Sequence, residues 1–164
     1  MRTVVAIAAV LAILFTASCG PKRHQYDGPE VTRIVVNKED RKMYLLHGTE
    51  ILKSYNIELG FAPEGHKQFE GDGKTPEGRY VIDRRNPNSA FYLSIGVSYP
   101  NRADVEHAKA NGKKPGGEIF IHGGRRPKDP KRPDWTAGCI SVKNREMLEI
   151  FTMVRLGTVI DINP

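Results

Sequence analysis

A histidine and a cysteine with catalytic potential stand 17 positions apart in the stretch IFIHGGRRPKDPKRPDWTAGCISVKN, residues 119–144. A cysteine is a useful nucleophile only as the thiolate, so it needs a base or a local positive field. His122 follows an apolar, β-branched run, and two glycines after it leave its ring accessible. An imidazole within hydrogen-bond reach takes the thiol proton and later gives it to a leaving amine. The pattern predicts Cys139 as nucleophile and His122 as base.

The glycine before the cysteine adds a second catalytic element. A tight turn at Gly138 would aim the backbone N–H groups of Gly138 and Cys139 at the attacked carbonyl and form an oxyanion hole. Taken alone, the sequence AGC indicates a plain turn. A structural zinc is the competing chemistry, but one cysteine and one histidine leave it two ligands short, and no other histidine shows ligand spacing. We therefore expect no metal and no cofactor.

The N-terminal segment is typical of an exported protein. One arginine precedes an uninterrupted apolar run over residues 3–17, which is shorter than the ~20 residues of a membrane-spanning helix. Small residues then precede Cys19, and in this the segment resembles a bacterial lipoprotein signal, which places small residues before an acceptor cysteine. These features predict a signal peptide over residues 1–18, lipidation of Cys19 and a polar, lipid-anchored tether over residues 19–30. An uncleaved anchor helix, or cleavage elsewhere with an incidental Cys19, stays open.

The cysteine count makes the second thiol conspicuous. The chain has two cysteines, and Cys19 is either lipidated or removed with the signal. Cys139 then has no partner for a disulfide within the chain. An unpaired cysteine in an oxidising, exported setting needs a functional reason. A buried, inert thiol is the alternative.

Length and composition indicate one β-rich domain. The 164 residues are 39% hydrophobic and 27% charged, with 16 Gly and 11 Pro. Such a chain forms short strands and many turns rather than a helical bundle. We predict a mainly β (β-rich α+β) domain over residues 31–164, a sandwich or half-closed barrel with two short helices. The net charge of +6 favours anionic partners at the cell wall or membrane, and nucleic acid is not expected in that compartment.

Periodicity and turn residues place the elements that position the two reactive side chains. A long Gly- and Pro-rich loop over residues 60–77 is expected to be functional or mobile, with Lys67 at the surface by default. Asn144 is predicted to cap the second helix and Gly157 to end it. The predicted strands are 31–36, 42–47, 51–59, 78–85, 90–99, 117–123, 138–142 and 158–162, and the predicted helices are 103–111 and 145–156.

These motifs resemble a known family. The pattern HGG…DWTAGCISVKN closely resembles the signature of the L,D-transpeptidase catalytic domain, also called the YkuD-type domain. That signature joins a His-Gly on a strand to a Ser/Thr-x-Gly-Cys turn. The stretch EGDGKTPEGRYVI, residues 70–82, resembles the family's second hallmark loop. The resemblance covers roughly residues 31–162 and is nearest to the single-domain periplasmic branch.

The resemblance implies a β-sandwich-like fold and a specific reaction. Cys139 would attack the carbonyl of the third residue, usually diaminopimelate, of a peptidoglycan stem peptide and expel the terminal D-Ala. His122 would act as base and general acid, and the backbone carbonyl of Gly123 would orient its ring. An amine would resolve the acyl-enzyme, giving a cross-link or a lipoprotein attachment, or water would hydrolyse it. Such activity serves cell-wall organisation and cell shape.

Two departures from the family pattern leave alternatives open. Many members carry His or Lys where Ala137 stands, and Arg where Ser141 stands. Loss of that arginine removes a candidate carboxylate clamp. Alternatives to the transpeptidase are an L,D-hydrolase (a carboxypeptidase, or an amidase that releases wall-attached lipoprotein) and a non-catalytic wall-binding lipoprotein.

Four further residues are candidates for substrate contact. Thr136 lies in the cysteine turn, and Trp135 either lines the acyl groove or anchors the loop. Arg125 belongs to a basic loop over residues 125–133 that is either a lid binding stem-peptide carboxylates or a solvated segment. Tyr99 bounds the cleft or belongs to the core. We expect a monomer at the periplasmic face, anchored by lipid to an outer membrane.

Overall fold

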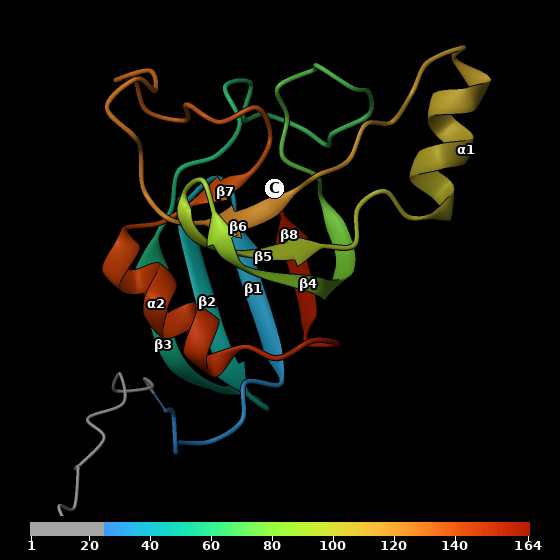
Figure 1. The fold of residues 1–164 in the computed structure, drawn as a ribbon. Coiled ribbons are helices and arrows are strands. Elements are labelled where there is room, and N and C mark those ends of the chain that lie inside the picture. The colour runs from blue at the N-terminus through green and yellow to red at the C-terminus, as the bar shows by residue number, and fades with distance from the viewer. Residues whose placement is uncertain (1–24) are drawn as a thin grey trace, which may run out of the picture.

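The computed structural model describes residues 25–164, and these form one curled sheet with two helices (Figure 1). The predicted signal peptide, Cys19 and the first part of the tether lie outside the described residues. No helix within residues 25–164 is long and apolar enough to cross a bilayer. The strands are β1 (Arg33–Asn37), β2 (Lys42–His47), β3 (Glu50–Asn56), β4 (Gly78–Ser89), β5 (Tyr92–Val97), β6 (Phe120–His122), β7 (Ile140–Ser141) and β8 (Val159–Asn163); the helices are α1 (Arg102–Ala110) and α2 (Asn144–Met153).

The eight strands follow the order β3-β2-β1-β8-β4-β5-β6-β7. Neighbours are antiparallel except for β1 with β8 and β6 with β7, which are parallel. Beyond β7 the sheet meets the chain that leaves β3, because Glu58 and Ser141 exchange backbone hydrogen bonds of 2.9 and 2.8 Å. This contact curls the sheet toward closure. Of the two predicted architectures, a sandwich and a half-closed barrel, the structure is therefore the half-closed barrel.

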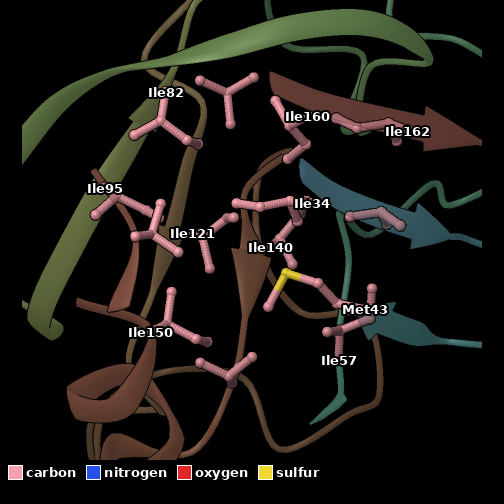
Figure 2. Packing of buried hydrophobic residues seen from close by; sticks show 14 of the residues in the cluster. Ile34, Met43, Ile57, Ile82, Ile95, Ile121, Ile140, Ile150, Ile160 and Ile162 are labelled. Atoms are coloured by element: carbon pink, nitrogen blue, oxygen red, sulfur yellow. The ribbon is translucent and has the colours of Figure 1, made fainter. Parts of the chain in front are cut away.

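Alternating side chains explain why this sheet encloses a core. Every second residue of β1 and β8 is buried, at Ile34, Val36, Ile160 and Ile162. Isoleucines from β4, β5, β6 and β7 meet them, and α2 packs against β5 and β6 with Ile150 pointing into the same cluster (Figure 2). The β-branched residues suit the pleated surface, as their sequence pattern predicted.

The second helix begins differently from the prediction. Lys143 is its N-cap, and the Lys143 backbone N–H donates to the Glu146 carboxylate at 3.0 Å. Asn144 is the first helical residue, and its side-chain oxygen accepts the Gly124 N–H at 2.8 Å. The prediction of Asn144 as cap was therefore wrong, because a tertiary partner takes its side chain. The helix also ends earlier, at Met153, before the turn at Gly157.

Two long connections lie side by side at one end of the sheet (top of Figure 1). They are the loop 60–77 and the loop 123–135, and the Phe61 N–H donates to Thr136 O at 2.9 Å where they meet. The first loop is held by Asp72, whose carboxylate accepts the buried Lys67 ammonium at 2.8 Å and the Lys74 N–H at 3.0 Å. Lys67 is 3% exposed, so its expected surface position was wrong.

Candidate active site

His122 ends β6 with its imidazole held in one orientation. Its Nδ1 lies 2.7 Å from the backbone carbonyl oxygen of Gly123, which can only accept. Nδ1 therefore carries the proton of the neutral ring, and Nε2 keeps the free lone pair that a general base needs. The Ser141 hydroxyl donates to the same carbonyl at 3.3 Å. The Gly123 carbonyl thus holds the orientation of the ring, and its part in catalysis stays a prediction.

Two aromatic rings enclose the imidazole. Phe91 stacks on His122 with a centroid separation of 4.4 Å, and Trp135 meets it edge-on at 5.7 Å. The Trp135 Nε1–H donates to the Glu58 carboxylate at 2.7 Å, and Arg125 donates to the other oxygen of that carboxylate at 2.8 Å. His122 is 3% exposed as a result, so the expectation that the two glycines leave its ring accessible was wrong. No sequence pattern points to Phe91 or Glu58, because both lie far from the motif in the chain.

Thr136 shapes the turn that carries the cysteine. Its hydroxyl donates to Cys139 O at 2.7 Å and accepts the Gly138 N–H at 3.2 Å. The Gly138 N–H, predicted as an oxyanion donor, is therefore engaged by Thr136. The Cys139 N–H has no acceptor within residues 25–164. It is the donor of this turn that stays available to an oxyanion.

Strand register brings Cys139 and His122 to one face of the sheet. Ile121 pairs with Ile140, and both point into the core. Their neighbours Cys139 and His122 consequently share the opposite, outer face on adjacent chain segments. The Cys139 thiol is partly exposed and donates to Glu118 O at 3.4 Å. Proton transfer to His122 would require the thiol to turn from this carbonyl toward Nε2, and catalytic hydrogen bonds often tighten only with substrate bound.

The electrostatics favour an uncharged pair in this state. Desolvation raises the pKa of the Cys139 thiol and the Glu118 carboxylate raises it further, while the Phe120 N–H and the Lys67 ammonium act in the opposite sense. Desolvation also lowers the pKa of His122, against the effect of the Gly123 carbonyl. Both directions favour thiol with neutral imidazole over thiolate with imidazolium. The site is thus suited to general-base activation of the thiol as substrate binds.

The four predicted substrate contacts fall into different environments. Trp135 and Thr136 are buried beside the two reactive residues. Arg125 reaches the Glu58 carboxylate and stacks over the Trp135 ring at 5.5 Å. Tyr99 is 3% exposed, and its hydroxyl donates to Pro115 O at 3.0 Å, which places its side chain in the core. Contact of any of them with substrate stays a prediction.

Comparison with known proteins decides the family. The sequence model described as the L,D-transpeptidase catalytic domain, YkuD, matches residues 31–162. The chain belongs to the L,D-transpeptidase catalytic domain family. The histidine strand and the cysteine turn that suggested this resemblance lie inside the matched region. Membership of this family supports an enzymatic function for the chain. The curled, mostly β sheet with two helices is the fold of the family.

Several relatives of this L,D-transpeptidase domain are informative. The Escherichia coli K12 protein named "Putative L,D-transpeptidase YafK" is 32% identical over 127 residues, 74% of this chain and 46% of its own length. The crystal structure of the helical cell shape determining protein Pgp2 from Campylobacter jejuni matches with a TM-score of 0.62 and 28% identity, over 82% of this chain and 48% of that one. Bd1075 from Bdellovibrio bacteriovorus matches at a TM-score of 0.57 and 28% identity, over 81% and 48%. The chain spans about half the length of each.

Replacing Gly138 with alanine tests the cysteine turn of this L,D-transpeptidase domain. Gly138 has a φ of +136°, and a Cβ there would lie 2.7 Å from the Lys74 carbonyl oxygen. We expect Gly138→Ala to lower stability by about 2 kcal/mol and to slow acylation of Cys139 at least tenfold. Thermal unfolding and the rate of thiol acylation measure these effects. Gly124→Ala is the control, since the nearest atom there is 3.6 Å away; equal behaviour of the two variants would contradict the assignment.

Proposed function

We propose that the protein is a cysteine-dependent peptidoglycan L,D-transpeptidase. Cys139 attacks the carbonyl of the third residue of a tetrapeptide stem, the C–N bond to the terminal D-Ala breaks, and a thioester forms. An amine acceptor then attacks the thioester carbonyl and restores the thiol. The observation that supports this is the shared outer face of His122 and Cys139, with Nδ1 of His122 bound to Gly123 O and Nε2 left as the base.

Each proton in this reaction has a residue to carry it. His122 Nε2 takes the thiol proton as sulfur attacks, and the resulting imidazolium gives it to the nitrogen of the departing D-Ala. The Gly123 carbonyl stabilises the imidazolium through the Nδ1–H bond of 2.7 Å. The Cys139 N–H faces the oxyanion of the tetrahedral intermediate. Deacylation runs the same proton path in reverse, with the acceptor amine losing its proton to Nε2.

A pocket beside β7 offers room for a second substrate. Its volume is about 400 Å³, and its lining includes Glu58, Arg125, Ser141 and Lys143. Arg125 and Lys143 supply positive charge for a carboxylate-bearing stem peptide, and Glu58 supplies an acceptor for an ammonium. The pocket adjoins the outer face on which His122 lies. It therefore supports transfer to a peptide amine.

Hydrolysis by the same acyl-enzyme is the second candidate. Ser141 stands where many family members carry arginine, and its side chain is 2% exposed and turned to Gly123 O. Without that cation the acceptor is held less firmly, and water can take its place. An L,D-carboxypeptidase would then release D-Ala and tripeptide, and an amidase would release a wall-attached lipoprotein. A non-catalytic wall-binding protein would need neither a held imidazole nor an accessible thiol.

Product analysis of stem-peptide digests distinguishes these candidates. Tetrapeptide muropeptides are incubated with the protein, with and without an added amine acceptor, and the products are analysed by mass spectrometry. For the transpeptidase we expect D-Ala release together with dimers joined between two third residues. Tripeptide and D-Ala without dimers would instead assign the hydrolase. If a folded sample neither releases D-Ala nor becomes acylated, both enzymatic candidates are excluded and the non-catalytic wall-binding protein is the candidate that remains.

We also propose that lipid on Cys19 holds the protein at the periplasmic face of an outer membrane. The apolar run over residues 3–17 and the small residues before Cys19 support this. Anchoring would raise the effective concentration of the catalytic domain near the wall. We expect labelled palmitate to enter the wild-type protein in cells and to be lost in Cys19→Ser. Equal labelling of both would remove Cys19 as the acceptor.

A further inference from the structure

Four residues on four neighbouring segments form one row across the outer face of the sheet. Arg84 of β4 pairs with Gly96 of β5, and Gly96 pairs with Phe120 of β6. Continuing the register of β6 with β7 by one residue places Cys139 beside Phe120. Segments in a sheet lie about 4.8 Å apart, so the row leads from Arg84 to the nucleophile over about 14 Å.

The missing side chain of Gly96 lets Arg84 cross the sheet along this row. A Cβ at Gly96 would lie 2.9 Å from Arg84 Nε and 2.6 Å from Asp83 Oδ1. Through this gap the guanidinium of Arg84 reaches β6, where it lies 4.7 Å from the centroid of the Phe120 ring. The cation is thereby brought from β4 toward the cysteine turn.

The guanidinium ends at Glu118, which borders the thiol. Arg84 Nη1 donates to Glu118 Oε1 at 2.8 Å, and the backbone carbonyl of Glu118 accepts the Cys139 S–H at 3.4 Å. Glu118 has a φ of +55°, a conformation that a non-glycine residue adopts at a cost. Such outliers gather at functional sites. Glu118 thus contacts the nucleophile through its backbone and presents a side-chain carboxylate that is 77% exposed.

The ion pair leaves one donor and one acceptor open to a ligand. Arg84 Nε donates to Asp83 and Nη1 to Glu118, and within residues 25–164 Nη2 has no acceptor. Glu118 Oε2 likewise receives no donor from the described part of the chain. Side by side, a free guanidinium N–H and a free carboxylate oxygen complement a group that carries an ammonium and a carboxylate on one carbon.

The third residue of the donor stem can bring such a group to this place. In the proposed reaction its carbonyl carbon bonds to Cys139 Sγ, so its side chain starts next to the thiol. In diaminopimelate three methylenes separate the two α-carbons, which gives a reach of about 5 Å at the backbone's rise per bond. The backbone oxygen of Glu118 contacts the thiol, and Arg84 is hydrogen-bonded to the side-chain carboxylate of the same residue. A lysine side chain of similar length would present the ammonium alone.

We propose that Arg84 and Glu118 form a specificity subsite for the zwitterionic end of a diaminopimelate side chain at the third position of the donor stem. Arg84 binds the carboxylate and Glu118 the ammonium. The proposal rests on the proposed acyl transfer at Cys139 and adds the residues that select the donor. It makes diaminopimelate-containing stems better donors than stems with lysine at the third position.

Two synthetic tetrapeptides that differ only in diaminopimelate or lysine at the third residue test the subsite. With the full-length wild-type protein we expect kcat/KM for D-Ala release to be at least about tenfold higher for the diaminopimelate peptide, as for other charge-assisted bidentate contacts. In Arg84→Met the ratio should fall to within about twofold, because the carboxylate loses its partner. Gly96→Val should lower it too, since the added side chain displaces a guanidinium that is still present.

The matched control is Arg79→Met. Arg79 lies on the same strand and is also paired with an aspartate, Asp161, but its side chain points to solvent at 67% exposure. It should keep the wild-type ratio. An unchanged ratio in both Arg84→Met and Gly96→Val would reduce the pair to a surface salt bridge and overturn the proposal.

Binding separates failure of the subsite from failure of the proposed reaction. If the wild-type protein releases D-Ala from neither peptide, the proposed function fails, and calorimetry on the full-length Cys139→Ala protein then decides the subsite. The tripeptide with diaminopimelate should bind at least about tenfold more tightly than the tripeptide with lysine, and Arg84→Met in this background should remove the difference. Equal affinity in the Cys139→Ala protein itself would overturn the subsite.

Discussion

Replacing Cys139 with alanine is expected to abolish D-Ala release, with kcat/KM falling by at least about 10³-fold, because in the proposed reaction the Cys139 thiol forms the acyl-enzyme. The fold should persist. The thiol is partly exposed and makes one hydrogen bond, to Glu118 O, so its loss costs about 1 kcal/mol or less. Release of D-Ala and the thermal unfolding midpoint are the two measurements. A folded but inactive variant is the expected combination.

A carbapenem gives the same prediction a direct readout. Its strained lactam carbonyl should acylate the wild-type thiol and add the mass of the inhibitor, and the added mass should be missing in Cys139→Ala. Because the sequence holds a second cysteine at Cys19, peptide mapping must locate the adduct. Cys139→Ser is the conservative control, since its hydroxyl has a far higher pKa than a thiol and should react much more slowly. An adduct on another residue, or turnover in the alanine variant, would remove Cys139 from the mechanism.

The sequence was sufficient to predict the chemical groups of the site but not the surroundings that enclose them. Local signals were sufficient for the strand that ends at His122 and for the turn at Gly138, because strand alternation and glycine placement act over a few residues. The enclosure of the imidazole by Phe91 and Trp135 depends on a contact between distant segments. Nothing in the residues around position 91 marks them for that role.

The wrong predictions share one physical cause. Asn144 is a good N-cap residue by type, yet the Gly124 N–H takes its oxygen and Lys143 becomes the cap. Lys67 is a typical surface residue by type, yet Asp72 and the Phe69 carbonyl satisfy its ammonium inside a loop. In both cases a hydrogen bond overrides a single-residue preference: Asn144 accepts from a distant segment, and Lys67 donates to residues two and five positions ahead because the loop folds back on itself. The residue type alone shows neither hydrogen-bond partner.

The same reasoning explains why Arg84 escaped the sequence analysis. A basic residue in the middle of a predicted strand indicates a solvent-facing position and nothing more. The role proposed for Arg84 depends on the bulge between Ile82 and Arg84, which redirects the side chain, and on the glycine opposite it at position 96. Register between three strands decides this placement. Only the folded chain shows that the guanidinium ends beside the cysteine turn.

Replacing His122 with alanine is expected to lower kcat/KM by about 10³-fold, since the proposed base for the thiol and the proposed acid for the leaving amine are lost together. Loss of the ring also leaves space between Phe91 and Trp135, at a cost of about 2 kcal/mol. His122→Gln keeps much of that volume without a titrating group and separates the two effects. His47→Ala, at an exposed histidine, is the control that should change neither quantity. Turnover near the wild-type rate in a folded His122→Gln would exclude the imidazole from the reaction.

The pH dependence of the wild-type enzyme tests the same role without a mutation. Desolvation lowers the pKa of His122 below its ordinary value of 6.5, so the ring is still neutral and able to accept the thiol proton at pH 6.5. The acid limb of kcat/KM should therefore lie below pH 6.5. Desolvation raises the pKa of the Cys139 thiol, so alkylation of the free thiol should keep rising with pH beyond the range of an ordinary cysteine. A thiolate–imidazolium pair would instead give fast alkylation in mildly acidic solution, and that result would replace general-base activation with a preformed ion pair.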